Sequence, residues 1–167
     1  MIKVVLILVL VVAFIVLGIK ISDHYKRRTK FFDDCIKYLN INIIAVSYSH
    51  NKLIETIQEN MDLFGNEFKE VLTLYKSFLK NEIERDNFNN LLYKKLYFLK
   101  PTEKCELVTF FCDLGIGDEE SEICKITTFK NRLEYTYKNV DNERKTYSPL
   151  YLKLSVVLAV LFFILFI

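Results

Sequence analysis

The side chains that commonly do chemistry are few in this chain of 167 residues, and they lie far apart. Neither of its two histidines, His24 and His50, has a nucleophile beside it. The carboxylates of Asp33 and Asp34 and those of Asp118–Glu120 are typical of a solvated helix surface and of an acidic first helical turn. The sequence contains no glycine-rich phosphate loop, no G-x-S-x-G and no H-E-x-x-H. We therefore predict a protein that is not an enzyme, needs no cofactor and has no small-molecule substrate.

The four cysteines do not form a metal-binding pattern. Cys35, Cys105, Cys112 and Cys124 include no pair with C-x-x-C spacing, and both histidines are distant from them in sequence. The sequence therefore predicts no metal site. Cys35 lies on the apolar face of a predicted helix, so we expect a small buried side chain there.

An apolar run stands at each end of the chain. Val4–Ile19 and Leu154–Ile167 are each long enough, or nearly so, to cross a hydrocarbon core of about 30 Å as a helix. The first run could instead be a cleaved signal peptide, but Leu17–Ile21 offers large residues where a cleavage site needs small ones. Lys153 can extend toward the membrane surface, which lets the residues before it join the second span. We predict a transmembrane helix over residues 1–21, a middle domain over 22–148 and a second transmembrane helix over 149–167.

Basic residues next to these runs predict the orientation. They are Lys20, Lys26, Arg27, Arg28 and Lys30 after the first run, and Lys138, Arg144 and Lys145 before the second. Only Lys3 opposes them, so the positive-inside rule places the middle domain in the cytoplasm and both termini outside, as in a multi-pass protein of the cell membrane. The net charge of +2 gives no reason to expect nucleic acid as a partner.

The middle domain has few helix-breaking residues, and its apolar residues recur every three or four positions. The whole chain contains two prolines and four glycines. This pattern predicts an all-α fold, an antiparallel helical bundle between two transmembrane helices. The expected helices cover residues 32–46 (continuing from the first span), 53–61, 64–79, 83–96 and 102–114, with a long last helix from Asp118 into the second span.

Predicted caps mark the last two helices of this domain. Thr102 can cap the first of them, and Gly115 suits a left-handed residue at its end. Asp118 is a natural cap for the helix that follows. The spacing Gly115-x-Gly117 is typical of a plain helix stop and start, but it can also expose backbone to a partner.

The layout as a whole resembles the stage III sporulation protein AB family. Tyr25 and Arg28 match an aromatic and a basic residue that follow the first span in that family. Val46-Ser47-Tyr48 followed by Lys52–Glu55 is similar to its Ile-x-Tyr and Pro-Leu-x-Glu segments. Leu114–Asp118 is similar to its Leu-Gly-x-Ser-Asp segment, and Glu122 stands in the place of a glutamine.

Three departures put side-chain roles at those positions in doubt. Ala45 stands in the place of a glutamate, Lys52 in the place of the proline and Gly117 in the place of the serine. The segments that carry the resemblance nevertheless imply a set of partner-binding residues, in which Gly117 is kept despite its departure. That set is Arg28, Tyr48, Leu114, Gly115, Gly117, Asp118 and Glu122.

The resemblance also implies a function. Members of this family lie in the mother-cell membrane around the forespore of endospore-forming bacteria, in a secretion-like channel assembly. Their soluble domain is similar to the helical cytoplasmic domain of type II secretion and type IV pilus platform proteins. The resemblance therefore implies a non-catalytic component that docks a cytoplasmic secretion-type ATPase and contacts other membrane proteins of the channel ring. A second interpretation stays open at this point, a small two-anchor membrane scaffold or lysis-type protein of viral or phage origin.

Overall fold

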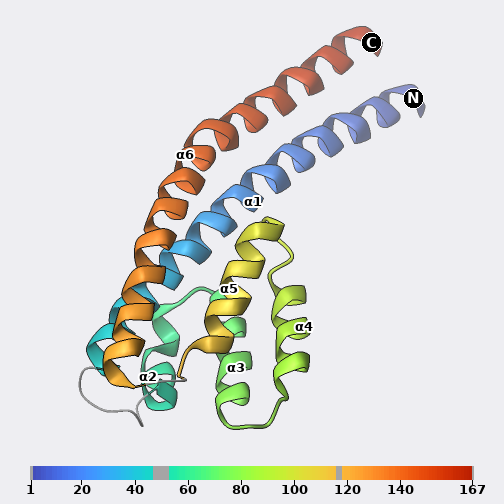
Figure 1. The fold of residues 1–167 in the computed structure, drawn as a ribbon. Helices are drawn as coiled ribbons and strands as arrows, with labels where there is room; N and C mark the ends of the chain where they lie inside the picture. The colour runs from blue at the N-terminus through green and yellow to red at the C-terminus, as the bar shows by residue number, and fades with distance from the viewer. Residues whose placement is uncertain (1, 47–52, 116–117, 167) are drawn as a thin grey trace. The chain divides into compact units, whose positions relative to one another are not determined.

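The computed structural model describes the backbone of residues 2–46, 53–115 and 118–166, and the side chains of 9–44, 53–115 and 118–165. Helices are the only regular secondary structure in these ranges, which confirms the all-α prediction (Figure 1). The elements are α1 (Ile2–Val46), α2 (Leu53–Asn60), a 3-10 turn η2 (Met61–Leu63), α3 (Asn66–Leu79), α4 (Arg85–Lys95), α5 (Pro101–Asp113) and α6 (Glu119–Phe166). The expected turn at Tyr48–Asn51 lies outside the described residues.

The two long helices confirm the predicted continuity with the ends of the chain. The helix expected over 32–46 begins at Ile2, and the last helix runs from Glu119 to Phe166. Contacts divide the chain into two compact units, unit 1 (residues 1–29 and 138–167) and unit 2 (residues 30–137). Each long helix contributes one part to each unit.

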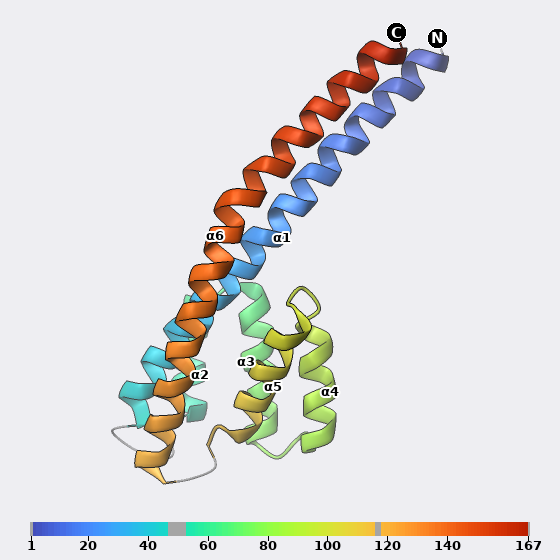
Figure 2. The ribbon, with the colours of Figure 1, turned by 45° about the horizontal axis from the view of Figure 1, so that its top comes forward.

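Unit 1 is an antiparallel pair of helices (Figure 2). Small residues lie where these two helices approach closely. A Cβ atom added to Gly18 would lie 2.1 Å from Ser155 Oγ, so only glycine fits opposite Ser155 at this point of the helix pair. The hydroxyls of Ser22 and Ser148 share a buried hydrogen bond of 2.6 Å. This bond leaves both hydroxyls satisfied between the helices.

Unit 2 has an aromatic core to which most of its helices contribute. Its largest fully buried side chains include Phe31, Phe32 and Tyr38 of α1, Phe68 and Tyr75 of α3, Phe88 of α4 and Phe111 of α5. The rings meet edge to face, with centroids 5.5 Å apart for Phe31 and Phe68 and 5.1 Å apart for Tyr75 and Phe111. Helices α3, α4 and α5 lie side by side around this core in both views (Figures 1 and 2).

Two sequence predictions about unit 2 are wrong. Thr102 is not a cap, because α5 begins one residue earlier at Pro101, which needs no acceptor for a backbone N–H. Instead the backbone N–H of Lys100 donates to the Glu103 carboxylate at 3.0 Å. Asp34 is not solvated but 1% exposed, because it accepts from the backbone N–H of Gly65 at 2.8 Å.

One helix among the described residues is long and apolar enough to cross a membrane. It covers Glu119–Leu165, and only 17% of its most apolar window is buried, which distinguishes it from the core helix of a soluble protein. The first predicted span begins among residues whose side chains are not described, and it stays a prediction.

Candidate docking surface

The junction between α5 and α6 adopts the conformation that its glycine predicts. Helix α5 ends at Asp113, Leu114 is extended, and Gly115 has a φ of +90°. This backbone conformation is strained for a residue with a side chain, so the glycine confirms the predicted helix stop. Asp118 confirms the predicted cap, because its carboxylate accepts from the backbone N–H of Ser121 at 3.4 Å.

Buried polar groups hold this junction from inside unit 2. The Glu122 side chain accepts from the backbone N–H of Gly115 at 2.9 Å and pairs with Lys125 at 2.9 Å. The Tyr75 hydroxyl donates to the Leu114 carbonyl at 3.1 Å, and burial raises the pKa of this phenol well above its usual value. Leu114 and Glu122 are 2% and 3% exposed, so their side chains hold the junction from inside unit 2.

The predicted partner-binding residues therefore fall into separate groups. Leu114, Gly115, Asp118 and Glu122 come together at the junction, where Asp118 and Gly115 are the exposed ones. Tyr48 and Gly117 lie outside the described residues. Arg28 belongs to unit 1 and not to this group.

Arg28 has a structural partner inside unit 1. Its guanidinium, with a side chain 4% exposed, meets the Glu143 carboxylate at 2.5 Å. Tyr25 stacks beside it on Tyr147 and Tyr151, with ring centroids 6.0 and 6.2 Å apart. Burial and then the neighbouring Tyr151 raise the pKa of Tyr25. These contacts join α1 to α6 within unit 1 and explain why an aromatic and a basic residue follow the first apolar run.

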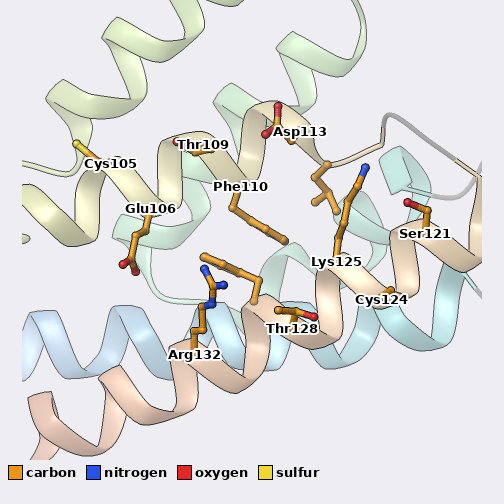
Figure 3. A pocket seen from close by; sticks show the side chains of 12 residues that line it. Cys105, Glu106, Thr109, Phe110, Asp113, Ser121, Cys124, Lys125, Thr128 and Arg132 are labelled. Carbon is orange, nitrogen blue, oxygen red and sulfur yellow. The ribbon is translucent and has the colours of Figure 1, made fainter.

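An open groove lies between α5 and the first part of α6, beside the junction (Figure 3). Its volume is about 740 Å³, and its walls are residues from 105–114 and 121–132. We call it the α5–α6 groove. The rings of Phe110 and Phe129 stack in it with centroids 3.9 Å apart and planes 7° apart. Both rings are only half-buried, so they offer apolar surface to a partner.

Charged residues are sorted by helix around this groove. The α5 wall carries Glu106 and Asp113, and the α6 wall carries Lys125 and Arg132. Two of them have partners nearby, Asp113 with Arg85 at 2.7 Å and Lys125 with Glu122. Figure 3 shows Glu106 and Arg132 toward the end of the groove that is distant from Asp113 and Ser121.

Sequence reasoning missed this groove, although one signal for it is visible. Phe110 directly precedes the buried Phe111, and successive residues of a helix point about 100° apart, so the two rings point in different directions and the Phe110 ring can reach the surface. The position of Phe129 opposite it depends on how α6 packs against α5. That packing is not readable from local spacing.

Cysteine chemistry in unit 2 differs between buried and exposed thiols. Cys105 and Cys124 are exposed in the groove, and Cys35 and Cys112 are buried. Burial raises the pKa of the Cys35 thiol well above its usual value, and burial also raises that of Cys112. The buried position of Cys35 confirms the prediction from its helical face. Within the described ranges, no three side chains of cysteine, histidine, aspartate or glutamate are grouped to hold a metal ion.

Comparison with known proteins identifies the family. The family model described as stage III sporulation protein AB (spore_III_AB) matches residues 3–167, almost the whole chain, and confirms the resemblance found in the sequence. No curated protein and no solved structure matches the chain.

Proposed function

The chain belongs to the stage III sporulation protein AB family, and from this membership we propose that it is a membrane-anchored, non-catalytic component of a channel between mother cell and forespore. Two spans would hold it in the membrane, and unit 2 would dock a cytoplasmic secretion-type ATPase. Further membrane proteins of the channel ring would contact the spans. An origin as a viral scaffold or lysis protein is not supported, because the family is a sporulation family.

The surface of unit 1 supports anchoring by both helices. Large apolar side chains face outward on α1, such as Val9 and Val12 at 61% and 50% exposed, and on α6, such as Ile164 and Leu165 at 70% and 71%. A soluble protein rarely exposes so much contiguous apolar surface, whereas lipid would cover it. The small residues between these two helices, Gly18 and Ser155 among them, are typical of helices that pack within a membrane.

Thiol labelling tests the proposed orientation. We expect an impermeant maleimide to leave Cys105 and Cys124 unmodified in intact sporulating cells and to modify both once the membrane is permeabilised. Cys35 is the internal control, because burial should keep it unmodified until the protein is denatured. Mass spectrometry of the chain reads the modification at each site. Labelling of Cys105 and Cys124 from outside intact cells would place unit 2 on the wrong side for an ATPase partner.

The α5–α6 groove is the observation that carries the docking proposal. The groove has a volume of about 740 Å³, an apolar floor and charged residues along its rim. It adjoins the junction to which the family resemblance assigns partner binding. Helical partners commonly bind in such grooves through a few apolar anchors. The exposed residues Gly115 and Asp118 lie next to the groove at its junction end.

Blocking the groove tests docking. Thr109 is exposed and lines the groove, so Thr109→Arg places a long charged side chain where a partner would pack. We expect co-purification with the host's secretion-type ATPase to fall about tenfold, the effect of losing roughly 1.4 kcal/mol at an interface. Thr102→Arg is the matched control, because Thr102 is exposed on the same helix outside the groove.

The two variants separate the possible failures. If the ATPase co-purifies equally with the Thr109→Arg protein and with the unaltered protein, it does not use the groove. An ATPase that fails to bind even the unaltered protein contradicts docking itself.

A further inference from the structure

We infer that the α5–α6 groove binds one amphipathic helix of the partner, with acidic side chains along one flank of that helix and basic side chains along the other. This inference deepens the proposed docking function and rests on it. It specifies the chemistry of the partner segment, which neither the family nor the anchoring argument provides.

The length of the groove fits a short helix. Its α5 wall runs from Cys105 to Asp113 and its α6 wall from Ser121 to Arg132, which correspond to about 12 and about 16 Å of helix. A partner helix presents apolar side chains at positions i, i+3 or i+4, and i+7 over about 10 Å of its axis. Three such anchors therefore fit between the ends of the groove.

The floor of the groove supplies the contacts that such anchors need. Phe110 and Phe129 stack face to face, with centroids 3.9 Å apart and planes 7° apart, so each ring covers one face of the other and the half-buried pair offers its outer faces and edges to apolar anchors. Aromatic residues in a concave apolar site are the type that contributes most to binding energy at interfaces. Leu114 lines the junction end of the groove, but its side chain is 2% exposed and adds little apolar surface.

Charge sorting around the rim defines the flanks of the partner. Acidic side chains line the α5 wall at both ends of the groove, and basic side chains line the α6 wall at both ends. Glu106 and Arg132 make no ion pair with any residue that the structure describes, so both are available to a partner at the end distant from the junction. A helix with basic residues toward α5 and acidic residues toward α6 would satisfy both walls, whereas an acyl chain or an apolar small molecule would satisfy neither.

Three designed peptides of about 14 residues test this inference. All carry the same stripe of leucines, and their flanks are either mixed (one lysine flank and one glutamate flank), all lysine or all glutamate. Fluorescence anisotropy measures their binding to the full chain in nanodiscs of neutral lipid, with empty nanodiscs as the background. We expect the mixed peptide to bind about fivefold tighter than either uniform peptide, because each uniform peptide meets one wall of like charge.

Charge reversal in the groove makes the test specific. At the end of the groove distant from the junction, Arg132→Glu leaves acidic side chains on both walls and should shift the preference to the all-lysine peptide. Glu106→Lys leaves basic side chains on both walls at that end and should shift the preference to the all-glutamate peptide. Phe129→Ala should weaken all three peptides together. Lys94→Glu is the control, because Lys94 is exposed on α4 outside the groove and its reversal should leave the preference unchanged.

The outcomes separate this inference from the docking proposal. Equal binding of the three peptides, or a preference that does not follow the charge reversals, overturns the inference even if the ATPase still binds. Dissociation of a chain dimer by the mixed peptide would assign the groove to a second copy of this chain and also overturn it. If the chain discriminates among the peptides but binds no ATPase, the result would support helix binding in the groove and contradict the ATPase as the partner.

Discussion

Replacing Glu122 with alanine should lower the free energy of unfolding by about 2–3 kcal/mol. The buried carboxylate accepts from the Gly115 backbone and pairs with Lys125, so its removal leaves a backbone N–H without that acceptor at the end of α5. Chemical denaturation of the full chain in nanodiscs, followed by tyrosine fluorescence, measures the change.

Two further variants test the physical reason for this loss. Glu122→Gln keeps an oxygen for the Gly115 N–H and should recover about half of the loss. Glu120→Ala removes an exposed carboxylate from the same first turn of α6 and should cost less than about 0.5 kcal/mol. Equal destabilisation by Glu122→Ala and Glu120→Ala would show that helix-end electrostatics, rather than the buried hydrogen bond, stabilises the junction.

Replacing Gly18 with alanine should separate the two helices of unit 1 and destabilise their pairing by about 1–3 kcal/mol. The added Cβ would lie 2.1 Å from Ser155 Oγ and 2.6 Å from Ser155 Cβ, so rotation of the serine hydroxyl alone does not relieve the overlap. Spin labels on the exposed residues Ile21 and Leu150 should report a longer distance between α1 and α6.

A compensating change distinguishes this overlap from a general effect of the substitution. Combining Gly18→Ala with Ser155→Gly removes both overlapping atoms and should restore most of the original distance. Ala13→Leu is the control on an exposed position of the same helix and should leave the distance unchanged. An altered distance in the control variant, or no recovery in the double variant, would contradict close packing at Gly18.

Features of this fold that depend on neighbouring positions could be predicted from the sequence. The helical spacing of apolar residues predicted the helices, and Gly115 and Asp118 marked the end of α5 and the start of α6 correctly. The apolar face around Cys35 predicted its burial. Each of these signals lies within a few residues of the feature that it predicts.

Features that depend on distant parts of the chain could not be predicted in this way. Asp34 was predicted to be solvated because the sequence around it gives no sign of its hydrogen bond. Its carboxylate accepts from the backbone N–H of Gly65, which lies 31 positions away. Glu122 was identified through the family resemblance as a partner-binding residue, yet its burial gives it a role inside unit 2. The α5–α6 groove was missed because it requires Phe110 and Phe129 to meet across two helices.

The contact between Asp34 and Gly65 has a consequence for the order of events during synthesis. The carboxylate caps the start of α3 from another helix, so α3 does not carry its own complete starting signal. On the ribosome the segment with Asp34 emerges first, and the acceptor therefore already exists when the Gly65 N–H appears. Vectorial translation thus presents this cap in the order in which the newborn chain needs it.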